Sequence, residues 1–129
     1  MAELQYPEGL QYTAEHEWVA GTDSESVVRV GITAFAQDAL GDVVFVDLPA
    51  VGDQIAGGST CGEVESTKSV SDIFAPLSGT VSAINETLEA TPELINSDPY
   101  GQGWLFEIDV DDISTSASLL SAADYRQLV

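Results

Sequence analysis

The sequence is poor in basic residues, in cysteine and in histidine. Arg29, Lys68 and Arg126 stand against 22 Asp and Glu residues, so the formal net charge is −19. A chain this acidic repels nucleic-acid phosphates and anionic membrane surfaces, and we expect neither as a partner. With Cys61 as its only cysteine, the chain can form no intramolecular disulfide. His16 is the sole histidine, and without a second His or a Cys pair no metal site is expected.

The chain also lacks a long apolar run and a basic leader. Its first seven residues contain no basic segment followed by an apolar stretch, so they resemble neither a secretory signal nor a transit peptide. The longest wholly apolar stretch, residues 43–46, is far shorter than the roughly 20 residues that span a bilayer. We therefore expect a cytoplasmic protein. The length of 129 residues predicts a single domain over residues 1–129, and 44% hydrophobic residues suffice for a buried core. We also expect a monomer.

Most of the chain predicts short β-strands separated by Gly- and Pro-containing turns. Apolar stretches, several of them rich in β-branched residues, predict strands at 10–14, 16–20, 26–32, 43–48, 59–65, 70–75, 80–85 and 104–110. The stretch 43–48 is apolar apart from Asp47 and is expected to be buried on both faces. Many short strands with such turns indicate a small antiparallel sandwich or barrel.

Helical patterns interrupt the strands in three places. Thr33 is a favourable N-cap for a helix over 34–40, and Gly41 follows at its C-terminal end. Residues 91–96 predict a short helical turn with a proline near its start. Leucines at helical spacing predict a C-terminal helix over 114–128 that packs outside the sheets. The predicted fold is thus mainly β, with a short helix after the first strands and a helix at the C-terminus.

Lys68 lies in a short polar segment between two strand-like stretches, which predicts a hairpin turn. A tight turn would present its amine outward, and the small neighbours Ser66, Thr67 and Ser69 leave room for a modifying enzyme. Nearby acidic residues such as Glu65 favour the charged, solvated amine. On the turn pattern alone, an ordinary solvated lysine is the simpler interpretation.

Several ordered blocks of the sequence resemble the glycine cleavage system H protein family. Residues 62–72, followed by 75–79, are similar to the lipoylation site of that family. Further similar blocks follow the family's order at 12–18, 30–33, 36–46, 95–100 and 103–105. The resemblance implies a barrel/sandwich hybrid of the biotinyl/lipoyl-carrier type. It also implies that lipoate is attached as N6-lipoyllysine at Lys68, with Glu65, Ser66, Thr67 and Ser69 as flanking recognition residues.

The resemblance further implies a carrier without catalysis of its own. Lipoyl-Lys68 would take an aminomethyl group from the pyridoxal-phosphate glycine decarboxylase (P protein) to the tetrahydrofolate-dependent aminomethyltransferase (T protein). Dihydrolipoamide dehydrogenase (L protein) would then reoxidise the arm, and lipoate-attaching enzymes would be further partners. The chemical steps would be carried out by the cofactor and the partner enzymes.

A cleft for the protonated amine of the loaded arm is also implied. In the family, positions matching Glu17, Phe35 and Asp72 surround such a cleft. Some relatives carry a polar residue in place of Phe35 and a basic residue in place of Glu107. The competing interpretation of Glu17 and Asp72 is that both are solvated surface carboxylates. His16 is expected to have a structural or hydrogen-bonding role beside Trp18.

Other functions compete with this assignment. A biotinyl domain would flank the lysine with methionines, whereas Thr67 and Ser69 stand here. A lipoyl domain serving 2-oxo acid dehydrogenases would usually have Asp before the lysine and would lack the opening at 15–18. An unmodified lipoyl-relay protein that recruits partners by its acidic surface is the remaining alternative. The acidity itself fits either steering toward basic partners or a salty cell interior.

Overall fold

The strands of the chain form two antiparallel sheets. A computed structural model describes residues 4–129, so the expectation for the first seven residues lies partly outside the described residues. The larger sheet has the order β1 (Gln11–Tyr12), β2 (Glu17–Gly21), β3 (Val27–Ile32), β9 (Phe106–Val110), β8 (Gly79–Ile84) and β5 (Gln54–Ile55). The smaller sheet has the order β4 (Val43–Asp47), β6 (Thr60–Ser66) and β7 (Val70–Phe74).

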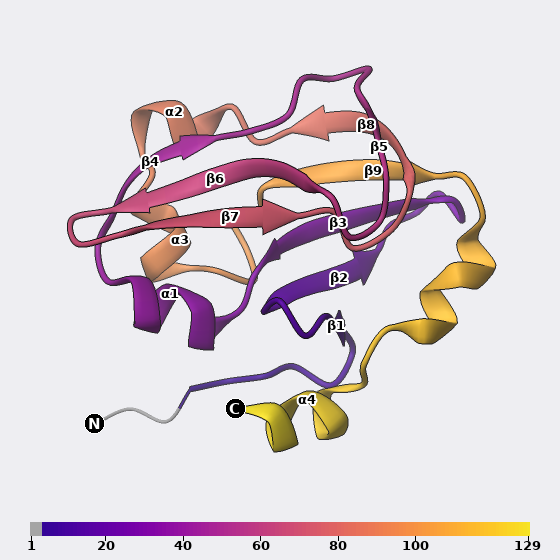
Figure 1. Cartoon of the computed structure of the whole chain (residues 1–129), viewed down its shortest axis with the longest axis horizontal. Coiled ribbons are helices and arrows are strands. Elements are labelled where there is room, and N and C mark those ends of the chain that lie inside the picture. The colour runs from indigo at the N-terminus through magenta and orange to yellow at the C-terminus, as the bar shows by residue number, and fades with distance from the viewer. Residues whose placement is uncertain (1–3) are drawn as a thin grey trace.

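The two sheets share one apolar core. Val64 and Ile73 of the smaller sheet belong to the same buried cluster as Val30, Phe106 and Ile108 of the larger sheet. The predicted mainly β sandwich is therefore confirmed. Within residues 4–129 the strands remain two separate sheets and do not close into a barrel, so the term barrel/sandwich hybrid fits only loosely. Figure 1 shows the β6–β7 turn projecting past the larger sheet on the side of α1 (Ala34–Leu40).

The prediction that residues 43–48 are buried on both faces is wrong. β4 is an edge strand, and its pairing with β6 shifts register between Val43 and Phe45. Val44 is 50% and Phe45 55% exposed. A bulge of this kind places extra residues opposite a single partner and turns the strand. The apolar pattern of this stretch therefore reflects a bulged edge and not a strand enclosed on both sides.

The first predicted helix is confirmed, including both of its ends. The side chain of Thr33 accepts a hydrogen bond from the main-chain nitrogen of Ala36, and the nitrogen of Gly41 donates to the carbonyl of Gln37. Gly41 adopts a φ of 83°, which favours glycine. The predicted turn at 91–96 begins later, as α3 (Leu94–Ser97). A short helix α2 (Thr87–Ala90) and the strand β5 were not predicted.

The predicted single helix over 114–128 is wrong in its continuity. A 3₁₀ segment η1 (Ile113–Ser118) and a separate helix α4 (Ala122–Leu128) occupy this region. Leu120 interrupts them because its main chain exchanges two hydrogen bonds of 2.8 Å with that of Tyr12. Ser121 then caps α4 by accepting a bond from the nitrogen of Asp124. None of the helices among residues 4–129 is both long and apolar enough to cross a membrane.

A second apolar cluster holds α4 against the first strands. Tyr12, Trp18, Ala122 and Tyr125 are all buried there. The rings of Tyr12 and Tyr125 stack with centroids 4.8 Å apart. The predicted packing of the C-terminal helix outside the sheets is confirmed, and Figure 1 shows it beneath β1 and β2.

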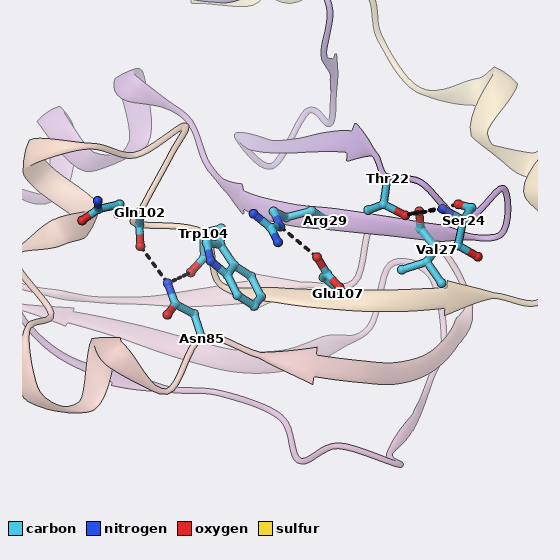
Figure 2. A network of polar contacts seen from close by, with 8 residues as sticks. All are labelled: Thr22, Ser24, Val27, Arg29, Asn85, Gln102, Trp104 and Glu107. Carbon is cyan, nitrogen blue, oxygen red and sulfur yellow. Dashed lines mark hydrogen bonds and ion pairs between the residues drawn. The ribbon is translucent and has the colours of Figure 1, made fainter.

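A polar network crosses β3 and β9 on the larger sheet. Arg29 lies opposite Glu107, and its Nε forms a 2.8 Å ion pair with the glutamate. The guanidinium also lies 4.3 Å from the centroid of the Trp104 ring. Asn85 donates from Nδ2 to the carbonyls of Gln102 and Trp104, as Figure 2 shows. Glu107, at which some relatives carry a basic residue, is thus paired with one of the few cations of the chain.

Gly31 on β3 allows a test of the packing around the buried ring of Trp18. A Cβ at residue 31 would lie 2.5 Å from three ring atoms of Trp18, whose Nε1 donates to the carbonyl of Pro99 at 2.9 Å. Because that ring is buried and hydrogen-bonded, any shift of the ring away from residue 31 would lower stability. We expect Gly31→Ala to lower the free energy of unfolding by about 1–3 kcal/mol, measured by denaturant titration. Gly21→Ala, whose Cβ would meet nothing within 4 Å, is the control, and equal losses in both variants would contradict this account.

Candidate functional site

The turn between β6 and β7 is fixed by the side chain of Ser66. Its Oγ accepts hydrogen bonds from the main-chain nitrogens of Lys68 (3.3 Å) and Ser69 (3.0 Å). The same hydroxyl donates to the carbonyl of Ser69 at 3.1 Å. Ser66 is 6% exposed, whereas Thr67, Lys68 and Ser69 are exposed. The predicted hairpin is therefore present, and it presents the lysine to solvent from a rigid turn.

A second anchor holds the turn against the segment that follows α1. The main-chain nitrogen of Thr67 donates to the carbonyl of Asp42 at 3.1 Å. A Cβ at Gly41 would lie 3.3 Å from Cε of Lys68, so the aliphatic stem of the lysine passes over this glycine. Glu65 at the end of β6 is exposed. All four predicted flanking residues thus lie around Lys68, and Ser66 differs from the others because it faces inward.

A cleft of about 300 Å³ adjoins the hairpin. Glu17 of β2, Phe35 of α1 and Asp72 of β7 all line it, so the structure brings the three cleft candidates together. Ser69 and Val70, which follow Lys68 directly, line the same cleft. A cavity therefore begins at the lysine-bearing turn and extends toward the larger sheet.

Glu17 is buried in the wall of the cleft and joins the two sheets. Its carboxylate accepts a hydrogen bond from the Thr13 hydroxyl on Oε1 (3.0 Å) and one from the Phe74 nitrogen on Oε2 (3.1 Å). Burial raises the pKa of Glu17 to about 7, although both hydrogen bonds act to lower it. At 1% exposure, Glu17 is not the solvated carboxylate of the competing interpretation, whereas Asp72 is exposed.

An aromatic and polar network supports the part of the cleft formed by His16 and Phe35. The half-buried ring of Phe35 lies 4.7 Å from that of His16, measured between centroids. Nδ1 of His16 and the hydroxyl of Tyr125 are 2.7 Å apart, and this hydroxyl also bonds to Oγ1 of Thr33 at 2.8 Å. The hydrogen-bonding role predicted for His16 is confirmed, and its partner is Tyr125. Burial lowers the pKa of His16.

Cys61 is a weak candidate nucleophile in this structure. Burial raises the pKa of the Cys61 thiol to about 11, so the thiolate is disfavoured at neutral pH. In the described part of the chain, no group of three or more His, Cys, Asp or Glu side chains is placed to hold a metal ion. Lys68 and the adjoining cleft remain the chemically distinctive features.

An exposed lysine on the rigid hairpin of a small two-sheet protein, next to a cleft, defines a cofactor-carrier architecture. Residues 10–129 match the family of the glycine cleavage H-protein. The chain is 60% identical over 119 residues to the glycine cleavage system H protein of Micrococcus luteus, covering 92% of this chain and 93% of the relative. The corresponding protein of Mycobacterium leprae is 59% identical over 124 residues, with 93% of each chain covered.

Solved structures agree with the sequence comparison. A crystal structure of a glycine cleavage system H protein from Mycobacterium marinum matches with a TM-score of 0.86 and 44% identity, covering 95% of this chain and 97% of the other. The chain belongs to the glycine cleavage H-protein family. Membership confirms the predicted family and makes the chain a lipoyl-carrier subunit of glycine cleavage, with other components of that system as partners.

The pH dependence of stability tests the burial of Glu17. Because the folded-state pKa of about 7 lies above the ordinary value of 4.5, ionising this carboxyl destabilises the folded state as pH rises between those values. Glu17→Gln removes this penalty, so its free energy of unfolding should gain about 3 kcal/mol on the parent from about pH 4 to about pH 8. Denaturant titrations across this range measure the difference.

The control for this measurement is Ser82→Ala, at an exposed neutral residue of β8. Because this change removes no ionisable group, its difference from the parent should stay constant with pH. A difference between Glu17→Gln and the parent that is equally flat would contradict a raised pKa for Glu17.

The Tyr125 hydroxyl gives a second test. Tyr125→Phe leaves Nδ1 of His16 and Oγ1 of Thr33 without this partner, so stability should fall by about 1–3 kcal/mol in thermal or denaturant unfolding. Tyr6→Phe is the matched control, because the Tyr6 ring also packs against Tyr125 and it is the main-chain carbonyl of Tyr6, not its hydroxyl, that accepts the hydrogen bond from Arg126. If both variants were equally stable, the network would not support the cleft.

Proposed function

We propose that Lys68 is the lipoyl attachment residue of this chain. In this role the protein carries an aminomethyl group from the pyridoxal-phosphate glycine decarboxylase to the tetrahydrofolate-dependent aminomethyltransferase, and dihydrolipoamide dehydrogenase reoxidises it. The proposal includes a cytoplasmic monomer with one lipoyl-carrier domain over residues 1–129. The observation that carries it is the position of Lys68: the only lysine of the chain lies exposed on a rigid turn beside a cleft.

The residues around Lys68 fit an amide-linked lipoyl group. Nζ is on an exposed side chain, the Ser66 hydroxyl fixes the main chain of the turn, and Gly41 leaves space beside the lysine stem. Small or exposed neighbours give an attaching enzyme access to the amine. When bound, the group supplies a dithiolane whose sulfurs take up and release the one-carbon cargo and its electrons.

The cleft residues limit access of water and supply negative charge. Phe35, Val70 and Ile73 contribute apolar surface that limits water in the cleft. Each carboxylate oxygen of Glu17 accepts one hydrogen bond from the protein and retains a free lone pair. With a pKa of about 7, Glu17 is partly ionised near neutral pH and can hold a cationic amine together with the exposed carboxylate of Asp72. Phe35 serves here as an apolar wall.

The negative charge of the chain favours its encounters with the partner enzymes. A net charge of −19 attracts basic docking surfaces and speeds productive encounters at low ionic strength. Tethering the cargo to the carrier also raises its effective concentration at each enzyme.

Moving the lysine tests the assignment. Lys68→Arg keeps the charge but removes the amine that forms the amide, so glycine cleavage by the reconstituted enzymes should fall to the level without carrier. The matched control is Lys68→Arg with Arg126→Lys, which moves the only lysine to an exposed position on α4. We expect this double variant to remain unmodified by intact mass and inactive. Full activity of Lys68→Arg would exclude Lys68 as the attachment residue.

A further inference from the structure

We propose that the outer face of the β4–β6–β7 sheet is the docking surface for the enzyme that acylates Lys68. Val44 and Phe45 form its apolar anchor, and a row of carboxylates on the same face meets basic side chains of that enzyme. The inference rests on the proposed function, since it requires that Lys68 is modified. It concerns residues that lie outside the cleft walls described above, apart from Val70 and Asp72.

The anchor arises from the bulge in β4. Val43 pairs with the buried Ser66, and after the register shift Phe45 pairs with Glu65. Val44 and Phe45 are therefore consecutive and both at least half exposed, on an edge strand beside the hairpin turn. An exposed apolar edge invites unwanted association unless a partner covers it.

Two cross-strand rows make up the rest of the surface. Phe45, Glu65 and Val70 lie opposite one another across β4, β6 and β7. Asp47, Glu63 and Asp72 form the next row, two residues away along each strand. Because side chains alternate between faces along a strand, both rows lie on the same face. We call these six residues, together with Val44, the hairpin face.

Exposed apolar side chains concentrate on the hairpin face. Of the seven large apolar side chains that are exposed in residues 4–129, three belong to it: Val44, Phe45 and Val70. All three flank the turn that bears Lys68. A scattered set of surface residues would need no explanation, but this grouping around one amine favours an interface.

The carboxylate row defines the charge of the partner. Asp47, Glu63 and Asp72, with Asp53, line a groove of about 570 Å³ next to the anchor. Like charges directly opposite one another across strands destabilise a sheet. Basic side chains entering the groove would offset this repulsion, so the complementary surface carries Arg or Lys around an apolar pocket.

Because the hairpin face lies beside Nζ, the acylating enzyme is the partner expected to bind it. In the acylation step a bond forms between Nζ and the acyl carbon of a lipoyl adenylate, the bond from that carbon to AMP breaks, and Nζ loses a proton. The active site must therefore surround Nζ itself and cover the adjoining sheet. Enzymes that act on cargo at the far end of an attached arm need no such contact.

Kinetics of attachment test the anchor. The probe is a purified ATP-dependent lipoate–protein ligase with lipoate and ATP, and acylation of each full-length variant is followed by intact mass. We expect Val44→Thr with Phe45→Thr to raise KM for the carrier at least about tenfold with little change in kcat, as removal of an interface anchor does. Val51→Thr with Ile113→Thr removes two exposed apolar residues elsewhere and should leave KM unchanged.

The carboxylate row is tested in the same assay. Asp47→Asn with Glu63→Gln should raise KM and weaken its dependence on salt, because fewer charge pairs remain to be screened. Asp23→Asn with Glu25→Gln removes the same charge from an exposed turn and should have a much smaller effect.

The outcomes separate this inference from the proposed function. If the parent protein is acylated at Lys68 and the anchor variant has the same KM as its control, the docking surface is wrong while the attachment site stands. If the parent is not acylated at Lys68, the proposed function itself fails. If acylation is unchanged in the anchor variant but its loading by the glycine decarboxylase drops, the acylating enzyme is the wrong occupant.

Discussion

The buried carboxylate of Glu17 links the parts of the molecule on which the carrier function depends. It starts β2 in the larger sheet, and the main-chain nitrogen of Phe74 in β7 donates to it across the sandwich. The Thr13 hydroxyl satisfies its other oxygen. A buried acid without such partners would be strongly destabilising. The strand that follows the lysine-bearing turn is thereby held in fixed relation to the larger sheet, and the cleft between them keeps its shape.

The turn that presents Lys68 is rigid, and the cleft beside it is open to an entering group. Ser66 fixes the turn through three hydrogen bonds, and Thr67 is tied to Asp42. The Tyr125 hydroxyl links α4 to His16 and to the cap of α1, the helix that carries the cleft residue Phe35. The C-terminal helix, far from Lys68 in sequence, therefore contributes to the site by supporting its wall.

Local signals in the sequence predicted most of the strands, the capped helix and the hairpin, because turn residues, caps and apolar periodicity act over a few residues. The exposure of Phe45 was not predictable in this way, since an apolar run looks alike in a buried strand and in a bulged edge. The break in the C-terminal helix depends on the pairing of Leu120 with Tyr12, a contact between the two ends of the chain. The burial of Glu17 depends on Phe74 in the same way. These features therefore depend on contacts between residues far apart in the sequence, which local patterns do not indicate.

The central claim is that Lys68 alone carries the lipoyl group, and peptide mapping tests it most directly. The protein is produced in cells that supply lipoate and the attaching enzymes, and its intact mass is measured before fragmentation. We expect a mass increase of one lipoyl group per chain, found only in the fragment that contains Lys68. A chain that stays unmodified under these conditions, or a lipoyl group on the α-amino terminus, would contradict it.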